Sequence, residues 1–313
     1  MRPYQTGTPV TLNRLRPLFV VLMLVLASPA LAQKPVREEV VGHFARPDIV
    51  ESSGIVASRK QPGVFWTMND SGGPAIVYAF DLTGRDLGAW RVTGAANQDW
   101  ESLSLGPCGA GSAGDCIYVG ETGDNSEQRP SRTLYRIAEP AVTGTAAPGW
   151  VGDSAQAERL DFVYPDGPHD DEAIYVASSG TTWFVTKGRS KGYLLFRLDA
   201  DRWGRTGVAT AQAAGELKLP TTGRELVTDA GLSPNGSALA VRTYQTLFIF
   251  RANPQTGEPD LAVTSSACDL KPLTEPQGEG VGWLAGGGLQ VLTSEAAAGQ
   301  ISVVACPVPA PAP

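Results

Sequence analysis

The sequence predicts an all-β fold, a single β-propeller of five blades, from three observations. The 313 residues include 36 Gly and 24 Pro, and short runs of Val, Ile, Leu, Tyr and Phe are bounded by turn residues without a long helical period. A three-part pattern recurs five times between residues 51 and 305. A strand-like segment before the first repeat matches the one strand that the last repeat lacks.

Each repeat begins with small or acidic residues that lead into a strand. When one residue per repeat is taken as equivalent, the spacings are 48, 71, 58 and 49 residues. Propeller blades recur about every 40–50 residues, so the longer spacings indicate insertions. The residues taken as equivalent are Ser53, Glu101, Glu172, Ala230 and Glu279.

Two further strands follow in every repeat, and the first four repeats are each expected to add an outer strand. The second strands are predicted at 64–70, 117–121, 183–187, 239–244 and 289–295. The third strands are predicted at 76–80, 133–137, 193–197, 246–250 and 301–305. The outer strands are predicted at 89–92, 160–164, 215–219 and 261–264.

The fifth repeat has no outer strand of its own. Residues 307–313 are too rich in Pro to join a sheet, and we expect this tail to be disordered. The segment 36–44 alternates like a strand, and pairing it with the last repeat would close the ring and leave no open edge. The propeller domain is therefore predicted to span residues 36–306.

Two other folds remain open at this point. A ring of six blades would form if the long gap between Ala138 and Tyr164 contained a degenerate blade. A β-sandwich would explain the alternating strands, but it would not explain the recurring cluster at the start of each repeat.

Residues 1–32 have the features of a secretory signal peptide. Three Arg precede an apolar run at 18–27, and Ala30-Leu31-Ala32 forms a small-x-small cleavage site. The alternative is a membrane anchor, but the run has about half of the roughly 20 apolar residues that span a bilayer. We expect a periplasmic or secreted protein without a membrane association after cleavage.

The four cysteines predict two disulfides, because an even count in an exported chain is typical of a disulfide framework. Cys108 and Cys116 flank a Gly-rich loop, which favours a local bond and leaves Cys268 to pair with Cys306. A zinc site is the alternative, but the sequence has neither a Cys-x-x-Cys pair nor a His near these residues.

The charge of the chain excludes one class of partner. The net charge is −7, and removal of residues 1–32 takes away three Arg and no acid, which leaves −10. Nucleic-acid binding depends on Lys and Arg at phosphates, so we expect no nucleic-acid partner. Cations and neutral ligands suit an acidic protein better, and we expect the protein to be a monomer.

The acidic clusters of the repeats are predicted to meet at one mouth of the central channel. Antiparallel neighbours run in opposite directions, so the start of each inner strand lies beside the end of the second strand. Clustered carboxylates repel unless they are neutralised, and Ca²⁺ takes about 6–8 oxygen ligands. Some of these residues serve only as Asx-turns. We expect bound Ca²⁺, with the candidate ligands Asp99, Glu101, Glu172, Glu279, Asp70 and Asp124.

Other polar residues at the same mouth are candidates for binding a small ligand. Lys187 and Arg242 are predicted at equivalent ends of second strands, where they would form salt bridges with the acids or hold an anionic group. The full set is Lys187, Arg242, Asn69, Asp171, Asp229 and Tyr244.

No catalytic residue is assigned from the sequence. It contains no Gly-x-Ser-x-Gly elbow, phosphate-binding loop or His-Glu-x-x-His motif. His169 lies beside acidic residues, where it would be a general base or a solvated loop residue.

Five short motifs stand out along the repeats: Asn69-Asp70-Ser71-Gly72, Asp99-Trp100-Glu101, Gly123-Asp124-Asn125, Asp171-Glu172-Ala173 and Thr186-Lys187. In these motifs the chain resembles a group of secreted bacterial propellers without assigned function, and more loosely the SdiA-regulated proteins and the esterase-like phytase domain. The resemblance implies a calcium-binding channel mouth and, for the phytase-like branch, phosphoester hydrolysis. This sequence departs from the pattern at three positions: Ser102 and Ala173 stand where Gly is expected, and Ala230 stands where an acid is needed. The expected ring of acids is therefore incomplete.

Two functions therefore remain in view, and whether the protein is an enzyme stays open. The first is an exported propeller that binds a divalent cation and a small ligand or protein partner at the acidic mouth. The second is a metal-dependent hydrolase of a phosphoester or lactone, in which the metal polarises the substrate or activates water.

Overall fold

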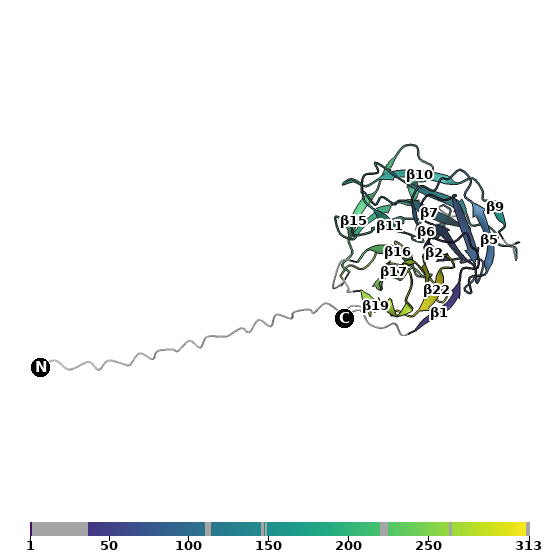
Figure 1. The fold of residues 1–313 in the computed structure, drawn as a ribbon. Coiled ribbons are helices and arrows are strands. Elements are labelled where there is room, and N and C mark those ends of the chain that lie inside the picture. Colours follow the sequence, from purple (N-terminus) through teal and green to yellow (C-terminus); the bar gives the residue numbers. More distant parts are fainter. Residues whose placement is uncertain are drawn as a thin grey trace.

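The computed structural model contains five β-sheets that radiate around a central axis, each a blade of a propeller (Figure 1). It describes Met1 and residues 37–109, 114–144, 147, 149–219, 225–262 and 265–310. The fold class and blade count predicted from the sequence are confirmed. Apart from Met1, the predicted signal peptide lies outside the described residues, as do residues 311–313 of the predicted tail.

The first two blades contain five strands each, in order from the channel outward. Blade one contains β2 (Ser52–Ala57), β3 (Phe65–Asn69), β4 (Ile76–Phe80), β5 (Asp86–Arg91) and β9 (Val151–Asp153). Blade two contains β6 (Trp100–Pro107), β7 (Asp115–Glu121), β8 (Arg132–Ala138), β10 (Glu158–Val163) and β14 (Ala209–Thr210).

The other three blades contain four strands each. Blade three contains β11 (Asp171–Val176), β12 (Thr182–Thr186), β13 (Leu194–Leu198) and β15 (Gln212–Glu216). Blade four contains β16 (Val227–Leu232), β17 (Ala238–Thr243), β18 (Thr246–Arg251) and β19 (Ser266–Asp269). Blade five contains β20 (Gly278–Trp283), β21 (Gln290–Ser294), β22 (Gln300–Val304) and β1 (Glu38–His43).

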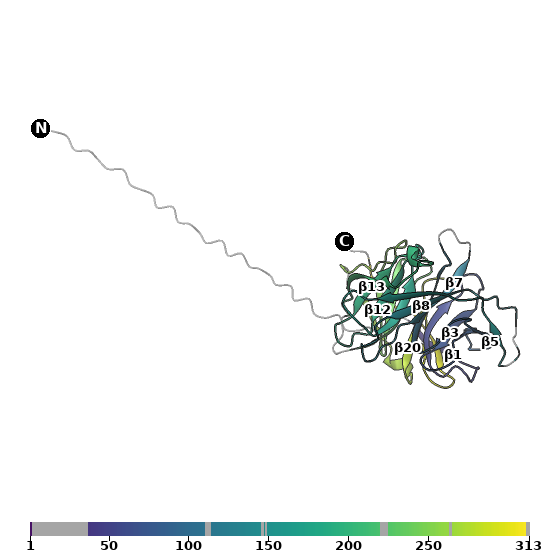
Figure 2. The same cartoon turned by 90° about the horizontal axis from the view of Figure 1, so that it is seen from above.

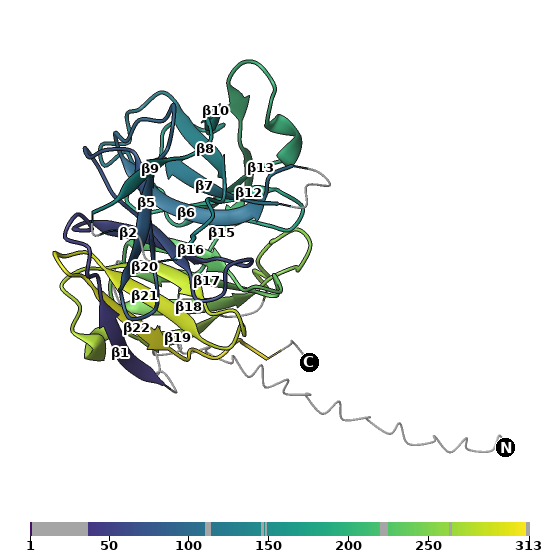
Figure 3. The same cartoon turned by 90° about the vertical axis from the view of Figure 1, so that its right-hand side faces the viewer.

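The two ends of the propeller meet in blade five, as the sequence predicts. Strand β1 pairs antiparallel with β22, in a register that places Glu38 opposite Val304 and His43 opposite Gln300. Figure 3 shows this N-terminal strand beside the C-terminal strands of the same blade. Because the outermost position of blade five is filled from the other end of the chain, the ring is closed.

The described residues of the long gap before residue 164 do not form a sixth blade. It supplies two peripheral strands instead: β9 pairs parallel with β5, and β10 pairs with β8. The five sheets lie around a single axis in Figure 1, and Figure 2 shows the same cartoon turned by 90°.

The outer strand of blade four was predicted at the wrong place. Leu261 and Ala262 lie in a turn, and residues 263–264 are outside the described residues. Strand β19 (Ser266–Asp269) takes the outer position and pairs with β18, with Cys268 opposite Leu247. Only two of its four residues are buried, so its hydrophobic pattern is weak.

The core lies between the blades and not within a single sheet. Five hydrophobic clusters fill the five spaces between neighbouring blades in the described part of the chain. Trp66 of blade one, for example, packs in the same cluster as Leu103 and Val119 of blade two. The three inner strands of each blade are therefore mostly buried on both faces, and each blade depends on its neighbours for its burial.

Each inner strand contains a β-bulge at the same place, directly after its first paired residue. Between the first and second rungs, one more residue lies on the inner strand than on its partner. A bulge changes the direction of the side chains around it. The residues that follow the first rung are Ser53, Glu101, Glu172, Thr228 and Glu279.

This register corrects one of the equivalences taken from the sequence. In blade four the matching residue is Thr228, because Ala230 lies two residues farther along and pairs with Val241. The hydroxyl of Thr228 donates to the carbonyl of Glu279, as that of Ser53 donates to the carbonyl of Glu101. The residue after the first rung therefore forms a hydrogen bond between neighbouring blades in two places, between blades one and two and between blades four and five.

Both predicted disulfides are present, between Cys108 and Cys116 and between Cys268 and Cys306. The second bond joins the outer strand of blade four to the segment after β22 in blade five. Two disulfides fit an exported protein. None of the helical segments in the described ranges has the length and apolarity needed to cross a bilayer.

We expect the Cys268–Cys306 bond to contribute more stability than the Cys108–Cys116 bond. The sequence separations are 38 and 8 residues, and a chain-entropy model gives about 4 and about 2.5 kcal/mol respectively. Urea unfolding of the two Cys→Ser double variants measures both values. An equal or larger loss in the Cys108→Ser/Cys116→Ser variant would contradict the expectation.

Candidate functional site

The starts of the inner strands and the ends of the second strands bring acidic side chains from several blades to one mouth of the channel. One group contains Asp70, Asp99 and Glu101, and one carboxylate oxygen from each lies within 4.8 Å of the others. A second group, with the same spacing, contains Glu101, Asp170 and Glu172. Glu101 belongs to both groups and is 3% exposed.

Local backbone contacts place the first group. An isolated antiparallel bridge between Ser71 and Asp99 holds the loop after β3 against the start of β6. Gly123 leaves the space that the carboxylates occupy: a Cβ atom there would lie 2.1 Å from Oε1 of Glu101 and 2.5 Å from Oδ2 of Asp99. Gly123 is thus required by the close approach of two acidic side chains.

The electrostatics of this group favour the protonated acids when no cation is present. Burial, reinforced by the charges of Asp99, Glu295 and Glu51, raises the pKa of Asp70 to about 7. Burial and the charge of Glu172 raise the pKa of Glu101 well above its usual range. Oδ1 of Asp70 is buried and has no hydrogen-bond partner within the described residues.

The second group already has basic partners. Nζ of Lys187 lies 2.5 Å from Oε1 of Glu172, and Arg189 forms an ion pair with Asp170. Burial raises the pKa of Glu172 to about 7, although Lys187 opposes this shift. Burial lowers the pKa of Lys187, but the Glu172 carboxylate outweighs it and the net shift is upward.

One arginine stands at the edge of the first group. Nη2 of Arg129 lies 2.8 Å from the carboxylate of Glu121, and Nη1 lies 4.0 Å from Asp99. Glu121 also accepts hydrogen bonds from the backbone N–H groups of Gln98 and Asp99. Asp70 and Glu101 form no ion pair in the described part of the chain, so this first group is the less neutralised of the two.

Two of the predicted metal ligands lie outside both groups. Glu279 reaches the same mouth, where burial raises its pKa to about 8, and its carboxylate accepts a hydrogen bond from Gln277. Asp124 lies 2.7 Å from Arg132. Although burial opposes ionisation, backbone N–H groups and Arg132 lower the pKa of Asp124. Its contacts hold the loop after β7.

Some of the predicted ligand-binding residues lie near the acidic groups, and others have structural contacts elsewhere. Lys187 contacts Glu172. Burial raises the pKa of Tyr244, and the charges of Lys187, Glu279 and Glu172 also influence it, so this residue lies in the same electrostatic environment. Arg242 instead donates to the carbonyls of Gly280 and Thr293 between blades four and five and pairs with Glu275. Its predicted equivalence to Lys187 is wrong. Thr186 and Thr243 occupy the first rung of their blades, so the residue that matches Lys187 is Tyr244, two residues after Arg242.

Two other members of that set serve the fold around the mouth. The side-chain amide of Asn69 accepts from the backbone of Val50 and Glu51 and donates to Asp48. Asp171 is fully buried and accepts a hydrogen bond of 2.6 Å from the hydroxyl of Tyr164.

Asp229 lies deeper, where it joins several blades across the channel. Its carboxylate accepts from the hydroxyl of Ser102 in blade two at 2.6 Å and from the N–H of Val281 in blade five at 2.8 Å. Burial raises its pKa to about 8 although these donors, together with the backbone of Ala230 and Ile55, lower it. The four contacts connect blades one, two, four and five.

His169 lies away from the mouth acids, packed between aromatic rings. It is 1% exposed and contacts the rings of Tyr164 and Phe196, and its Nε2 lies 2.9 Å from Asp166. It is a buried structural histidine in this arrangement.

Three residues near the mouth were not among the sequence candidates: Asp170, Glu121 and Gly123. Asp170 directly precedes two predicted candidates, so its position in the motif was the available signal. Glu121 ends a predicted second strand, and Gly123 belongs to a quoted motif. The close approach that Gly123 permits is visible only in three dimensions.

No protein-family model and no curated protein matches this sequence. Similar solved structures include a glutaminyl cyclase from Myxococcus xanthus, with 14% identity over 86% of this chain and 97% of that chain and a TM-score of 0.48. A gluconolactonase from Xanthomonas campestris has 11% identity over 87% and 90%, with a TM-score of 0.45. A PQQ-bound aldose sugar dehydrogenase from Streptomyces coelicolor has 11% identity over 88% and 98%, with a TM-score of 0.45.

None of these comparisons supports the resemblance to the SdiA-regulated proteins or to the phytase domain. The propeller itself stands on the strand pairing of this chain. At identities this low, the activities in the names of the solved structures say nothing about the chemistry of this mouth.

Replacing Asp229 with Ala should lower the free energy of unfolding by about 2–4 kcal/mol, because buried donors from several blades lose their acceptor. Asp229→Asn keeps one acceptor and one donor, as a protonated carboxyl does, so at pH 6 it should cost less. Urea unfolding measures both, with the exposed Asp153→Asn as the control, expected within about 0.5 kcal/mol of wild type. A loss in Asp229→Ala no larger than in this control would contradict the role of Asp229.

Proposed function

We propose that this chain is an exported β-propeller, periplasmic or secreted, that binds Ca²⁺ at the acidic mouth of its channel and presents the bound ion to a small ligand. One observation carries the proposal: the carboxylates of Asp70, Asp99 and Glu101 converge with no ion-pair partner closer than Arg129 in the described part of the chain. An acidic group alone is common on protein surfaces, so the spacing and burial of this one decide the argument.

The spacing of the three carboxylates suits a calcium ion. Ca²⁺–oxygen distances are about 2.3–2.6 Å, so two ligands on opposite sides of the ion lie at most about 5 Å apart. The oxygens of this group all lie within 4.8 Å of one another. Three carboxylates provide fewer than the roughly 6–8 oxygens that Ca²⁺ takes, and backbone carbonyls, water and the ligand itself would complete the shell.

The electrostatics support a cation at the same place. The raised pKa values of Asp70 and Glu101 mean that burying these carboxylates as anions is unfavourable. A divalent cation would replace the protons and satisfy the buried Oδ1 of Asp70. Lys187 and Tyr244, at the edge of the acids, are the residues we assign to the small ligand.

Calorimetry of EDTA-treated protein should show saturable Ca²⁺ binding at pH 8, together with a higher melting temperature. Binding should be much weaker at pH 5, because protons compete for carboxylates whose pKa values are raised, that of Asp70 to about 7. Glu101→Gln should weaken binding by at least about tenfold. No heat and no change in melting temperature at pH 8 would refute the cation site.

The metal-free protein supplies the control. Glu101→Gln removes a repelled buried charge, so in EDTA its stability at pH 8 should equal or exceed that of wild type. The raised folded-state pKa values make wild-type stability highest below about pH 4 to 5 for these groups and lower as the pH rises through 7. Glu39→Gln, on the outer strand β1, should change neither property. A Glu101→Gln variant that unfolds in EDTA would mean that Glu101 is structural.

A hydrolase of a phosphoester or lactone is the second candidate. The ammonium group of Lys187 beside the acids favours it, because a cation next to a bound metal would hold an anionic group. Arg242, the other predicted anion-binding residue, is occupied between blades and is left out of this role.

We expect any phosphatase, esterase or lactonase activity to require Ca²⁺ and to fall by at least about a hundredfold in Glu101→Gln, with Glu39→Gln unchanged. A panel of chromogenic substrates in Ca²⁺ and in EDTA tests this. Activity that survives both EDTA and the substitution would arise elsewhere and would reject the hydrolase at this mouth.

A further inference from the structure

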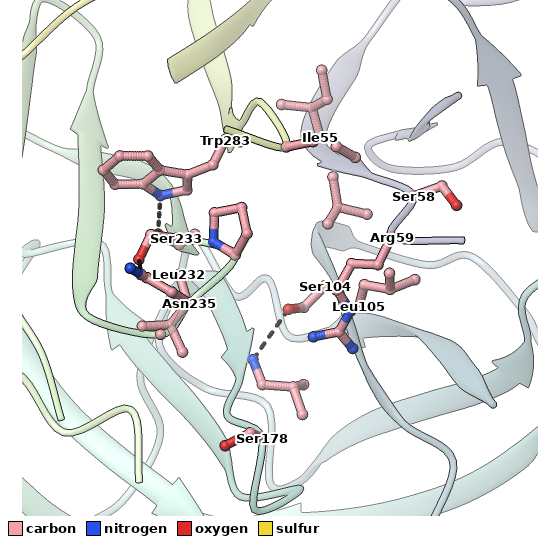
Figure 4. Close-up of a pocket in the computed structure, with 18 of the residues that line it drawn as sticks. Ile55, Ser58, Arg59, Ser104, Leu105, Ser178, Leu232, Ser233, Asn235 and Trp283 are labelled. Carbon is pink, nitrogen blue, oxygen red and sulfur yellow. Dashed lines mark hydrogen bonds between the residues drawn. The ribbon is translucent and has the colours of Figure 1, made fainter. Parts of the chain in front are cut away.

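The channel has a cavity at the end opposite the acidic mouth. It has a volume of about 440 Å³ and is lined by the far halves of the inner strands and the turns that follow them (Figure 4). Glu101 lies at the mouth, Ser102 contacts Asp229, and the next residue, Leu103, already lines this cavity. The layer of hydrogen bonds around Asp229 therefore separates the two ends.

The walls of this cavity are mainly apolar. Ile55, Leu103 and Leu105 come from blades one and two, and Leu232 and Trp283 come from blades four and five. Nε1 of Trp283 donates to the carbonyl of Gly231 at 2.8 Å, which fixes the ring (Figure 4). The volume lies within the range of about 300–1,000 Å³ that is typical of small-molecule sites.

The charge of the lining is opposite to that of the mouth. Among the described residues that line the cavity, Arg59 is the only charged one, and no acid is present. Its Nε and Nη2 atoms contact Asp115 at 3.0 and 2.8 Å, and Nη1 makes no hydrogen bond within the described residues. Figure 4 shows Arg59 among the lining residues, together with Ser104 and Leu105.

The lining also contains a neutral donor, the hydroxyl of Ser104. Oγ of Ser104 accepts a hydrogen bond from the N–H of Val176 at 3.1 Å, so its own O–H can point into the cavity. A guanidinium N–H and a hydroxyl that line the same apolar cavity suit a carboxylate, which can accept from both.

We propose that this cavity is a second binding site, for a small carboxylic acid with an aliphatic or aromatic body. The body lies against the apolar walls, and the carboxylate accepts hydrogen bonds from Nη1 of Arg59 and Oγ of Ser104. The site is independent of the proposed cation, because it lies at the other end of the channel and no acidic group lines it among the described residues.

Titration calorimetry in EDTA, with butanoate, hexanoate, octanoate and 4-phenylbutanoate as probes, tests the site. We expect saturable binding that strengthens with the size of the body, and binding of 4-phenylbutanamide weaker than that of its acid. Arg59→Gln should weaken the binding of 4-phenylbutanoate by about tenfold or more and leave the amide unchanged. Ala57→Phe, at a half-buried lining residue, should abolish the binding of both.

A matched variant distinguishes recognition from a structural role of the Arg59–Asp115 pair. Asp115→Asn removes the partner and keeps the cation, so 4-phenylbutanoate should bind as well as to wild type or more tightly. Equal weakening of acid and amide in both Arg59→Gln and Asp115→Asn would overturn the proposal, as would the absence of saturable binding for every probe. Glu39→Gln, on the outer strand β1, should bind the acids like wild type. Because the titrations are made in EDTA, failure of the cation site would leave this result intact.

Discussion

The pairing of β1 with β22 is the contact on which the rest of the structure depends. The core lies in five spaces between blades, so each blade is stable only when both of its neighbours are present. An open ring would expose one of those spaces to water, and without β1 the edge of β22 would have no partner. Closure also fixes the inner strands around the channel, and the Cys268–Cys306 bond reinforces it between blades four and five.

Inside the closed ring, a repeated bulge decides which side chains meet. The same irregularity at the start of all five inner strands turns one residue per blade toward the mouth. Three of these five residues are Glu, and the other two, Ser53 and Thr228, donate hydrogen bonds to the next blade. The fold therefore uses one position both to join blades and to collect carboxylates.

The sequence predicted the parts of the fold that depend on burial and repetition. The five repeats, the closing strand at 36–44 and both disulfides could be found because apolar runs and cysteine spacing are visible in one dimension. The errors in blade four have a different origin. Blade four has Thr228 where three other blades have Glu, so no acid marked the position, and Ala230 was matched in its place. Arg242 was likewise aligned with Lys187, although Thr243 is the residue that matches Thr186. The outer strand β19 was missed because it is only half buried.

The site could be predicted as a set of residue types but not as a geometry. Asp99 and Glu101 meet Asp70 because Gly123 leaves room for them, and Asp124, the next residue of the same motif, turns to Arg132 instead. Along β6 the environment then changes with every residue: Glu101 faces other acids, Ser102 donates to Asp229, and Leu103 lines the apolar cavity. These residues span about 7 Å of strand. This thin layer of buried hydrogen bonds can separate the acidic mouth from the cavity at the other end of the channel, because its donors and acceptors come from four different blades.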